Sequence, residues 1–213
     1  MQRVTRMTAE STIVVIDDNS GVRRSLRALL ESSNYAVADY ASAKSFLADG
    51  PRGDCLIVDV RMPEMSGLEL QEELVRRGST VPVIVVTGHA DVPVAVHAMK
   101  AGAFDLIEKP FDDRALLESI RRALTTGRLT RNNAAEAKVA DEKIGLLTGR
   151  EHEVLEHLVL GQSNKIVAHE LGISPRTVEI HRARIQEKMN AGGLSELVRI
   201  VRAAGIDLAV ASK

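Results

Sequence analysis

Two patterns of apolar and polar positions follow one another repeatedly along residues 12–125. Short runs of consecutive apolar residues, as at 13–16 and 55–58, are typical of strands buried on both faces of a sheet. Between these runs apolar residues recur at helical spacing, for example after Ser20, which is a good helix N-cap. Strands are expected at 13–16, 35–40, 55–58, 83–87 and 104–107, and helices at 20–34, 43–47, 68–75, 94–99 and 116–124. Five strands alternating with five helices predict a doubly wound parallel sheet with right-handed crossovers.

Residues 146–207 carry only helical patterns. Thr148 and Glu151 have the spacing of a capping box, and Ser163 and Ser174 are expected to cap the second and third helices. The positions expected to face inward are Val154, Leu155, Leu158, Val159, Ile166, Val167, Leu171, Val178 and Ile185, followed by Leu194, Leu197, Val198 and Val201 on a fourth helix. A short helix, a turn at Gly172 and a longer helix predict a helix-turn-helix, whose second helix enters the major groove of DNA.

Residues 126–145 separate these two parts. They are a polar mixture of Asn, Ala, Glu and Lys with little apolar stripe. The sequence leaves open whether they form a semi-rigid spacer or extend the preceding helix. The predicted organisation is therefore an α/β domain at 12–125, a linker at 126–145 and an all-α, four-helix domain at 146–207.

Charge differs between the two halves. Residues 11–125 carry 17 Asp/Glu and 13 Lys/Arg, a net charge of −4, whereas residues 146–213 carry 9 Lys/Arg and 8 Asp/Glu, a net charge of +1. The acidic half suits a cation site. Nucleic-acid binding by the other half must depend on local placement of charge.

Composition narrows the class of protein further. The single cysteine, Cys55, excludes a disulfide framework and is expected to be a small buried apolar residue. No apolar run reaches the roughly 18 residues of a membrane span, and residues 1–12 lack the core of a signal peptide. Aromatic residues make up 2%, which disfavours a base-stacking platform for single strands. We expect a cytoplasmic protein with no membrane partner.

Polar residues stand at the ends of four expected strands, on the edge where parallel sheets bind ligands. They are Asp17, Asp18, Asp59, Thr87 and Lys109. Singly they have ordinary explanations, such as a capping pair, a strand-end cap or a surface lysine. Together they suit phosphate chemistry, because Mg²⁺ neutralises clustered carboxylates and a carboxylate can itself form an aspartyl phosphate. The hydroxyl and the ammonium would contact phosphoryl oxygens, and a cis bond before Pro110 would aim the lysine inward.

Residues 12–125 resemble the receiver domain of bacterial two-component response regulators. The motifs that resemble the FixJ-type branch are Val60-Arg61-Met62-Pro63, Thr87-Gly88-His89-Ala90-Asp91-Val92-Pro93 and Glu108-Lys109-Pro110-Phe111. The resemblance implies that Asp59 is the phosphoacceptor and that Thr87 and Lys109 sense the phosphoryl group. It also implies a Mg²⁺ ion held by Asp17, Asp18, Asp59 and the backbone carbonyl of Arg61.

One position departs from the receiver pattern. The family usually has an aromatic switch residue three places before the lysine, and this chain has Leu106 there. Phe104 lies two residues away, which would place it on the same face of a strand. The departure leaves the chemistry of the site unchanged but bears on how phosphorylation is relayed.

Residues 146–204 resemble the LuxR-type DNA-binding domain. The motifs are Leu147-Thr148-Gly149-Arg150-Glu151, Ser163-Asn164-Lys165 and Ser174-Pro175-Arg176-Thr177-Val178-Glu179-Ile180-His181-Arg182. The resemblance implies phosphate contacts by Lys165, Thr177, Arg182 and Arg184. It implies base contacts by Arg176, Glu179, Ile180 and Ala183. For Glu179, a solvated helix face is an equally good explanation.

The expected function is that of a phosphorylation-activated, DNA-binding transcriptional regulator, which receives a phosphoryl group on Asp59 from a sensor histidine kinase. The expected partners are that kinase, double-stranded DNA with a pseudo-palindromic site, RNA polymerase and, after phosphorylation, a second copy of the chain. The alternative is a phosphorylation-independent regulator with a degenerate receiver. An enzyme is not expected, because phosphatases with an Asp nucleophile commonly need a second acid where this chain has Arg61.

Overall fold

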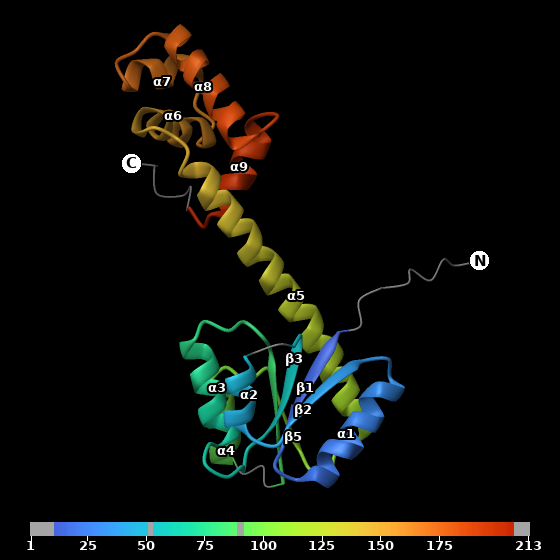
Figure 1. Cartoon of the computed structure of the whole chain (residues 1–213). Coiled ribbons are helices and arrows are strands. Elements are labelled where there is room, and N and C mark those ends of the chain that lie inside the picture. Colours follow the sequence, from blue (N-terminus) through green and yellow to red (C-terminus); the bar gives the residue numbers. More distant parts are fainter. Residues whose placement is uncertain (1–10, 51–52, 89–91, 207–213) are drawn as a thin grey trace, which may run out of the picture. The chain divides into compact units, whose positions relative to one another are not determined.

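The computed structural model describes residues 11–50, 53–88 and 92–206 of the 213-residue chain. Residues 89–91 of the Thr87–Pro93 motif and Asp207, the last residue of the expected second domain, lie outside the described residues. The first unit contains a sheet of five strands (Figure 1). These are β1 (Thr12–Ile16), β2 (Ala36–Tyr40), β3 (Cys55–Asp59), β4 (Val83–Thr87) and β5 (Asp105–Glu108). All neighbouring strands are parallel, in the order β2-β1-β3-β4-β5, so the predicted doubly wound sheet is confirmed.

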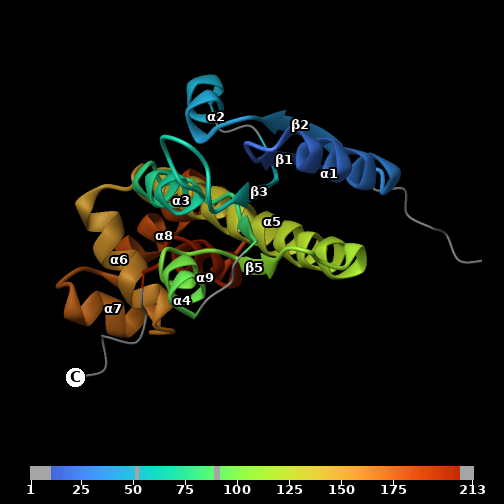
Figure 2. The ribbon, with the colours of Figure 1, turned by 90° about the horizontal axis from the view of Figure 1, so that it is seen from below.

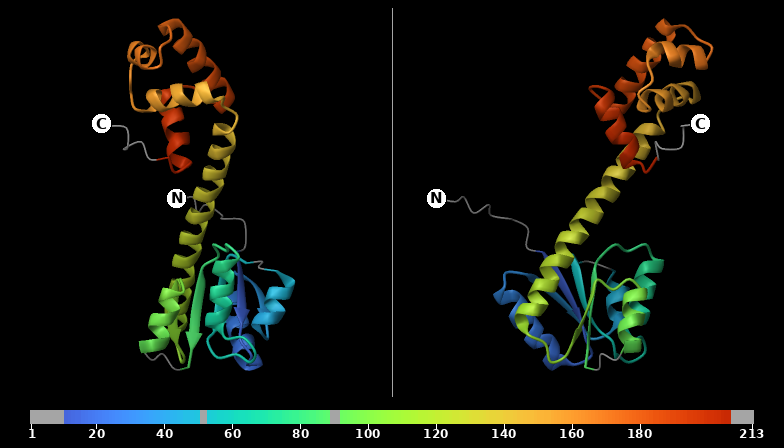
Figure 3. Two further views of the ribbon diagram at one scale, coloured as in Figure 1. Left: turned by 90° about the vertical axis from the view of Figure 1, so that its left-hand side faces the viewer. Right: turned by 180° about the vertical axis from the view of Figure 1, so that it is seen from behind.

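Helices cover both faces of this sheet. They are α1 (Ser20–Ser32), α2 (Ala43–Asp49), α3 (Gly67–Arg76), α4 (Val92–Lys100) and α5 (Asp113–Ile144). One core cluster packs α2, α3 and α4 against the sheet, and another packs α1 and the first turns of α5 against its other face (Figures 1, 2 and 3). Since β1, β3 and β4 are covered on both sides, their apolar residues are buried without alternation, as the consecutive runs predicted.

Two details of the first unit differ from expectation. Asn19, and not Ser20, caps α1: its side chain accepts from the backbone N–H groups of Gly21 and Val22 because Ser20 is already the first helical residue. Phe104 does not share a face with Leu106. It precedes the first residue of β5, so strand alternation does not apply, and it packs in the α1–α5 cluster while Leu106 packs in the α2–α4 cluster.

Helix α5 is continuous over 32 residues, from Asp113 to Ile144. It therefore includes nearly all of the segment 126–145, for which the sequence left helix and spacer open. The chain divides into two compact units within this helix, between Thr130 and Arg131.

The second unit is all-helical. After the end of α5 it contains α6 (Gly149–Val159), α7 (Asn164–Glu170), α8 (Pro175–Met189) and α9 (Leu194–Ala203). Val154, Val178 and Ile185 are fully buried in its core, as predicted. None of the described helices of the chain is long and apolar enough to cross a bilayer.

Two expectations for α7 were wrong. Ile166 is 48% exposed, because the short helix turns Val167 and Ala168 toward the core instead. Ser163 stands at the N-cap position, but its side chain makes no capping hydrogen bond.

Candidate functional site

The carboxyl edge of the sheet collects the polar residues that follow or end its strands. Asp17 follows β1, Asp59 ends β3, Thr87 ends β4 and Lys109 follows β5. Parallel pairing aligns these ends: Val86 is opposite Asp59, and Thr87 is opposite Glu108. The backbone N–H of Lys109 donates to the Thr87 carbonyl at 2.7 Å, so Lys109 lies beside the end of β4.

Lys109 joins two carboxylates at the centre of this edge. Its Nζ donates to Asp17 Oδ2 and to Asp59 Oδ1, each at 2.6 Å. The two acids are 1% and 7% exposed, so their charges face each other largely without water. Burial of Lys109 opposes its charged form, but the hydrogen bonds and charges of Asp17 and Asp59 outweigh burial and raise the pKa of Lys109.

Backbone N–H groups hold the remaining oxygens of both acids. The N–H of Asn19 donates to Asp17 Oδ1 at 2.8 Å, and the N–H of Arg61 donates to Asp59 Oδ2 at 2.7 Å. Thr87 is 1% exposed at the end of the neighbouring strand. The Lys109–Pro110 peptide bond is cis.

The residues expected to hold Mg²⁺ are not all brought together. Asp17 and Asp59 meet on Lys109, whereas the Asp18 side chain is exposed. Among the described residues, no three His, Cys, Asp or Glu side chains converge on one point. The donor chemistry nevertheless fits the ion, because buried carboxylate oxygens at a loop are the hard ligands that Mg²⁺ takes. In the structure, the Lys109 ammonium supplies the positive charge between the two acids.

Arg23 fixes the loop that carries Asp17 and Asp18. Its Nη1 donates to the carbonyl oxygens of Asp17 at 2.6 Å and Asp18 at 3.1 Å, while its Nε donates to Asp39 Oδ2 on β2 at 3.2 Å. Sequence reasoning missed this residue, because an arginine on the first turn of a helix reads as a solvated side chain. The signal that could have found it is Asp39, an acid in the strand next to β1.

Gly67 lies directly against the backbone of Asp59. A Cβ at this position would lie 2.2 Å from the Asp59 carbonyl oxygen and 2.9 Å from Val58 Cγ1. Only glycine lets the first turn of α3 come this close to the strand that carries Asp59. Sequence reasoning missed this contact.

The residues expected to bind DNA lie on α7 and α8. Lys165 is exposed at the start of α7, and Arg176, Glu179, Ile180, Ala183 and Arg184 are exposed along α8, whereas Thr177 and Arg182 are half-buried. Arg176 Nη1 lies 3.4 Å from Glu179 Oε2, so these two candidate base contacts pair with each other. The Thr177 hydroxyl lies 2.8 Å from the Ser174 hydroxyl at the cap of α8.

An ion pair between the partly exposed Lys188 and the buried Glu151 anchors the far end of α8. Lys188 Nζ donates to Glu151 Oε2 at 2.7 Å and to the Leu146 carbonyl at 3.1 Å. The Thr148 backbone N–H also donates to Glu151 Oε2, at 2.8 Å, so the predicted capping box is confirmed and extended to a second helix. Lys188 therefore holds α8 to the turn before α6 and is a structural cation.

Two family models match the chain. The response regulator receiver domain matches residues 13–121, and the LuxR family of bacterial regulatory proteins matches residues 145–201. The transcriptional regulatory protein FixJ of Azorhizobium caulinodans is 51% identical over 90% of this chain and 92% of its own length. FixJ of Rhizobium meliloti is 46% identical over 91% of this chain and 96% of its own length.

Solved structures agree with these matches. The response regulator StyR superposes with a TM-score of 0.79 at 40% identity, covering 91% of this chain and 99% of StyR. Full-length FixJ from B. japonicum gives a TM-score of 0.58 at 42% identity, covering 93% of this chain and 98% of FixJ. The family models include both the sheet edge with Asp17, Asp59 and Lys109 and the helix-turn-helix, and the relatives match nearly the whole sequence. The chain therefore belongs to the FixJ-type two-component response regulators, which join a receiver domain to a LuxR-type DNA-binding domain.

Proposed function

We propose that phosphorylation of Asp59 by a sensor histidine kinase controls DNA binding by the second unit, and that the chain regulates transcription in the cytoplasm in this way. The observation that carries the proposal is the pair of hydrogen bonds from Lys109 to Asp17 and Asp59 at the sheet edge. This arrangement places a buried carboxylate beside a fixed cation, which is what an acceptor of a phosphoryl group needs.

In the proposed reaction, a carboxylate oxygen of Asp59 attacks phosphorus and the histidine nitrogen of the kinase leaves. Lys109 contacts one phosphoryl oxygen and the Thr87 hydroxyl a second. Asp17, Asp18, Asp59 and the Arg61 carbonyl would hold Mg²⁺, which when bound neutralises negative charge on the phosphoryl oxygens. The elevated pKa keeps Lys109 charged throughout the neutral range.

The output surface we propose is the α4–β5–α5 face. On α4, Val92, Val96 and Met99 are 75%, 46% and 52% exposed. Their spacing of four and three residues makes one apolar stripe along the helix. Such a stripe suits a homodimer formed after a phosphoryl group of about two negative charges replaces the single carboxylate charge of Asp59. A shift from 1% to 99% active form requires phosphorylation to favour it by about 5.5 kcal/mol, part of which dimerisation and DNA can supply.

The DNA contacts we propose lie on α7 and α8. Arg176, Glu179, Ile180 and Ala183 face the bases, and Lys165, Thr177, Arg182 and Arg184 contact phosphates. A dimer would place two α8 helices on a pseudo-palindromic site, where RNA polymerase is the further partner. Arg176 has to exchange its pairing with Glu179 for base contacts.

A second candidate is a regulator that binds DNA irrespective of phosphorylation. The observation that favours it is the absence of an aromatic side chain at the usual switch position, where this chain has Leu106. Phe104 packs on the opposite side of the sheet and cannot replace it. The acid–lysine site favours the first candidate.

The test combines acetyl phosphate and Mg²⁺ with the wild-type chain and with Asp59→Asn. We expect the wild type to gain one phosphoryl group by mass, to dimerise and to bind its operator more tightly, and Asp59→Asn to do none of these. A wild type that takes up no phosphoryl group, or a variant that takes up the same amount, would refute the proposal. Uptake without any change in DNA binding would support the second candidate.

A further inference from the structure

The turn between α7 and α8 is built on a glycine. Gly172 has a φ of 64°, in the left-handed region that glycine adopts without strain. Its N–H donates to the His169 carbonyl at 3.3 Å, and the Ile173 N–H donates to the Ala168 carbonyl at 3.0 Å. These two hydrogen bonds reverse the chain at the end of α7 and satisfy carbonyl groups of its last turn. The carbonyl of Leu171, the C-cap residue, takes no part in them.

A side chain from α6 donates to this C-cap carbonyl. Arg150 Nη2 donates to the Leu171 carbonyl, while its Nη1 pairs with Glu153 on the same helix. Only 36% of the Arg150 side chain is exposed, so the contact is largely shielded from water. The guanidinium also lies at the C-terminal end of α7, where the helix dipole favours a positive charge. Arg150 therefore ties the first turn of α6 to the turn of the helix-turn-helix.

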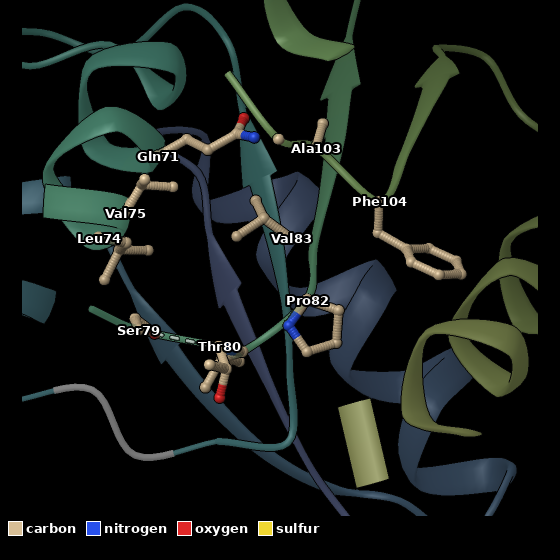
Figure 4. Close-up of a pocket in the computed structure, with 11 residues that line it drawn as sticks. Gln71, Leu74, Val75, Ser79, Thr80, Pro82, Val83, Ala103 and Phe104 are labelled. Atoms are coloured by element: carbon tan, nitrogen blue, oxygen red, sulfur yellow. Dashed lines mark hydrogen bonds between the residues drawn. The ribbon is translucent and has the colours of Figure 1, made fainter. Parts of the chain in front are cut away.

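The end of α3 shows that such a turn does not itself need an arginine. Gly78 has a φ of 73°, its N–H donates to the Val75 carbonyl at 2.9 Å, and the Ser79 N–H donates to the Leu74 carbonyl at 2.9 Å. Figure 4 shows Leu74 and Val75 at the end of α3, with Ser79 after them. No side chain among the described residues donates to the carbonyl of Arg77, the C-cap residue there. The role of Arg150 therefore lies in the contact between helices and not in ending α7.

This contact bears on DNA binding because the proposed DNA contacts lie on both sides of the turn. Lys165 stands at the start of α7, and Arg176 and Thr177 stand at the start of α8. These side chains can meet one duplex together only if the angle between the two helices is held. We propose that Arg150 is a positioning residue, which holds the turn through the Leu171 carbonyl and thereby aligns α8 in the major groove. The inference rests on the DNA binding proposed above.

The test compares two duplexes of equal length, one selected from a random-sequence pool by the full wild-type chain and one of unrelated sequence, with acetyl phosphate and Mg²⁺ present throughout. Arg150→Met keeps the apolar stem but removes the donor. We expect it to bind the selected duplex about tenfold more weakly, the effect of losing one hydrogen bond from a charged group. Its affinity for the unrelated duplex should stay within about twofold of wild type, because non-specific binding depends on phosphate contacts and not on the alignment of α8.

A control variant separates alignment from charge. Arg202→Ala removes an exposed cation of α9 in the same unit and should leave the ratio of the two affinities unchanged. The amide nitrogen of Gly172 shares a peptide group with the Leu171 carbonyl, so its resonance should shift in Arg150→Met and not in Arg202→Ala. Circular dichroism establishes that each variant is folded during the titration, and Arg150→Gln replaces Arg150→Met if that chain is not.

Two results would overturn the proposal while leaving the proposed function intact. One is an Arg150→Met chain that prefers the selected duplex as strongly as the wild type does. The other is an equal loss of affinity for both duplexes, which would reflect charge or stability and not alignment. A wild-type chain that selects no duplex from the pool would refute both this proposal and the proposed function.

Discussion

Arg23 lies outside the group of Asp17, Asp59 and Lys109, but it helps to position the loop that carries Asp17. The guanidinium spans from β2 to the loop after β1, where it holds two consecutive carbonyl groups. Only 16% of its side chain is exposed, so these contacts are shielded from water. Asp39, its partner, is shared with Arg27, whose guanidinium helps keep the pKa of Asp39 below its usual value.

We predict that Arg23→Ala lowers the affinity for Mg²⁺ and the rate of phosphorylation by acetyl phosphate by about tenfold each, the usual effect of losing a residue that orients metal ligands. Arg24→Ala is the matched control, since Arg24 is exposed on the same helix turn. Mg²⁺ titration and mass spectrometry measure the two effects. Equal behaviour of both variants would rule out the positioning role of Arg23.

Gly67 and Gly149 provide a second comparison between single residues. Each is the first residue of a helix that begins with a capping box. A Cβ at Gly67 would meet the Asp59 carbonyl oxygen at 2.2 Å, whereas a Cβ at Gly149 would meet nothing within 4 Å. We predict that Gly67→Ala destabilises the first unit by about 2 kcal/mol and slows phosphorylation, because α3 must move away from β3.

Gly149→Ala should instead be neutral or stabilising by less than about 1 kcal/mol. Urea unfolding followed by circular dichroism measures both changes. A Gly67→Ala chain as stable as the wild type would show that α3 shifts without cost.

At the scale of elements, α8 depends on a contact at its far end. Glu151 is 3% exposed and accepts from Lys188 on α8 and from Thr148 at the cap of α6. The Lys188 hydrogen bond, followed by that of the Thr148 backbone, lowers the pKa of Glu151 to about 2. This carboxylate therefore links the start of α6 to α8.

The pH dependence follows from the lowered pKa. Since the folded value lies below the unfolded value, the stability that Glu151 contributes is complete above about pH 4.5 and is lost as the pH falls toward about 2. We predict that Glu151→Gln destabilises α8 by about 2 kcal/mol at pH 7 and removes this part of the acid sensitivity. Hydrogen exchange of residues 175–189 at pH 7 and pH 3 measures both effects.

Glu153→Gln serves as the control, because Glu153 is 51% exposed on the same helix and pairs with Arg150. Its exchange should match the wild type at both pH values. The role assigned to Glu151 fails if Glu151→Gln exchanges like this control.

For the whole molecule, the informative feature is that α5 belongs to both units. Leu116 and Ile120 are buried in the first unit, and Ala140 and Ile144 are buried in the core of the second. The chain divides between Thr130 and Arg131 without a break in the helix. We therefore expect α5 to be the route by which phosphorylation of Asp59 affects the second unit.

We predict that Thr130→Pro uncouples DNA binding from the phosphorylation of Asp59. Thr130 is exposed, so the substitution removes little packing, but proline deletes a helical hydrogen bond at a cost of about 3 kcal/mol. Phosphorylation of Asp59 and the DNA affinity without phosphodonor should stay within about twofold of wild type, since each unit keeps its own core, while the phosphodonor-dependent gain in affinity is lost. Thr130→Ala should retain that gain. If Thr130→Pro also retains it in full, the signal does not pass through an intact α5.

The order of strands and helices, the parallel sheet, the capping box of α6 and the helix-turn-helix could be predicted from the sequence, because each depends on residues close together in the chain. Hydropathy patterns are read over a few residues, and Ile166 was misplaced because the seven-residue α7 has too few apolar positions to define its buried face.

The contacts between residues far apart in the sequence became visible only in the folded chain. Lys109 reaches Asp17 across 92 positions and Asp59 across 50, Arg23 meets Asp39, and Gly67 abuts the carbonyl of Asp59. The exposure of Asp18, the side taken by Phe104 and the continuity of α5 were decided in the same way. Packing and charge pairing depend on which elements lie side by side, whereas hydropathy spacing indicates only which face of each element is buried.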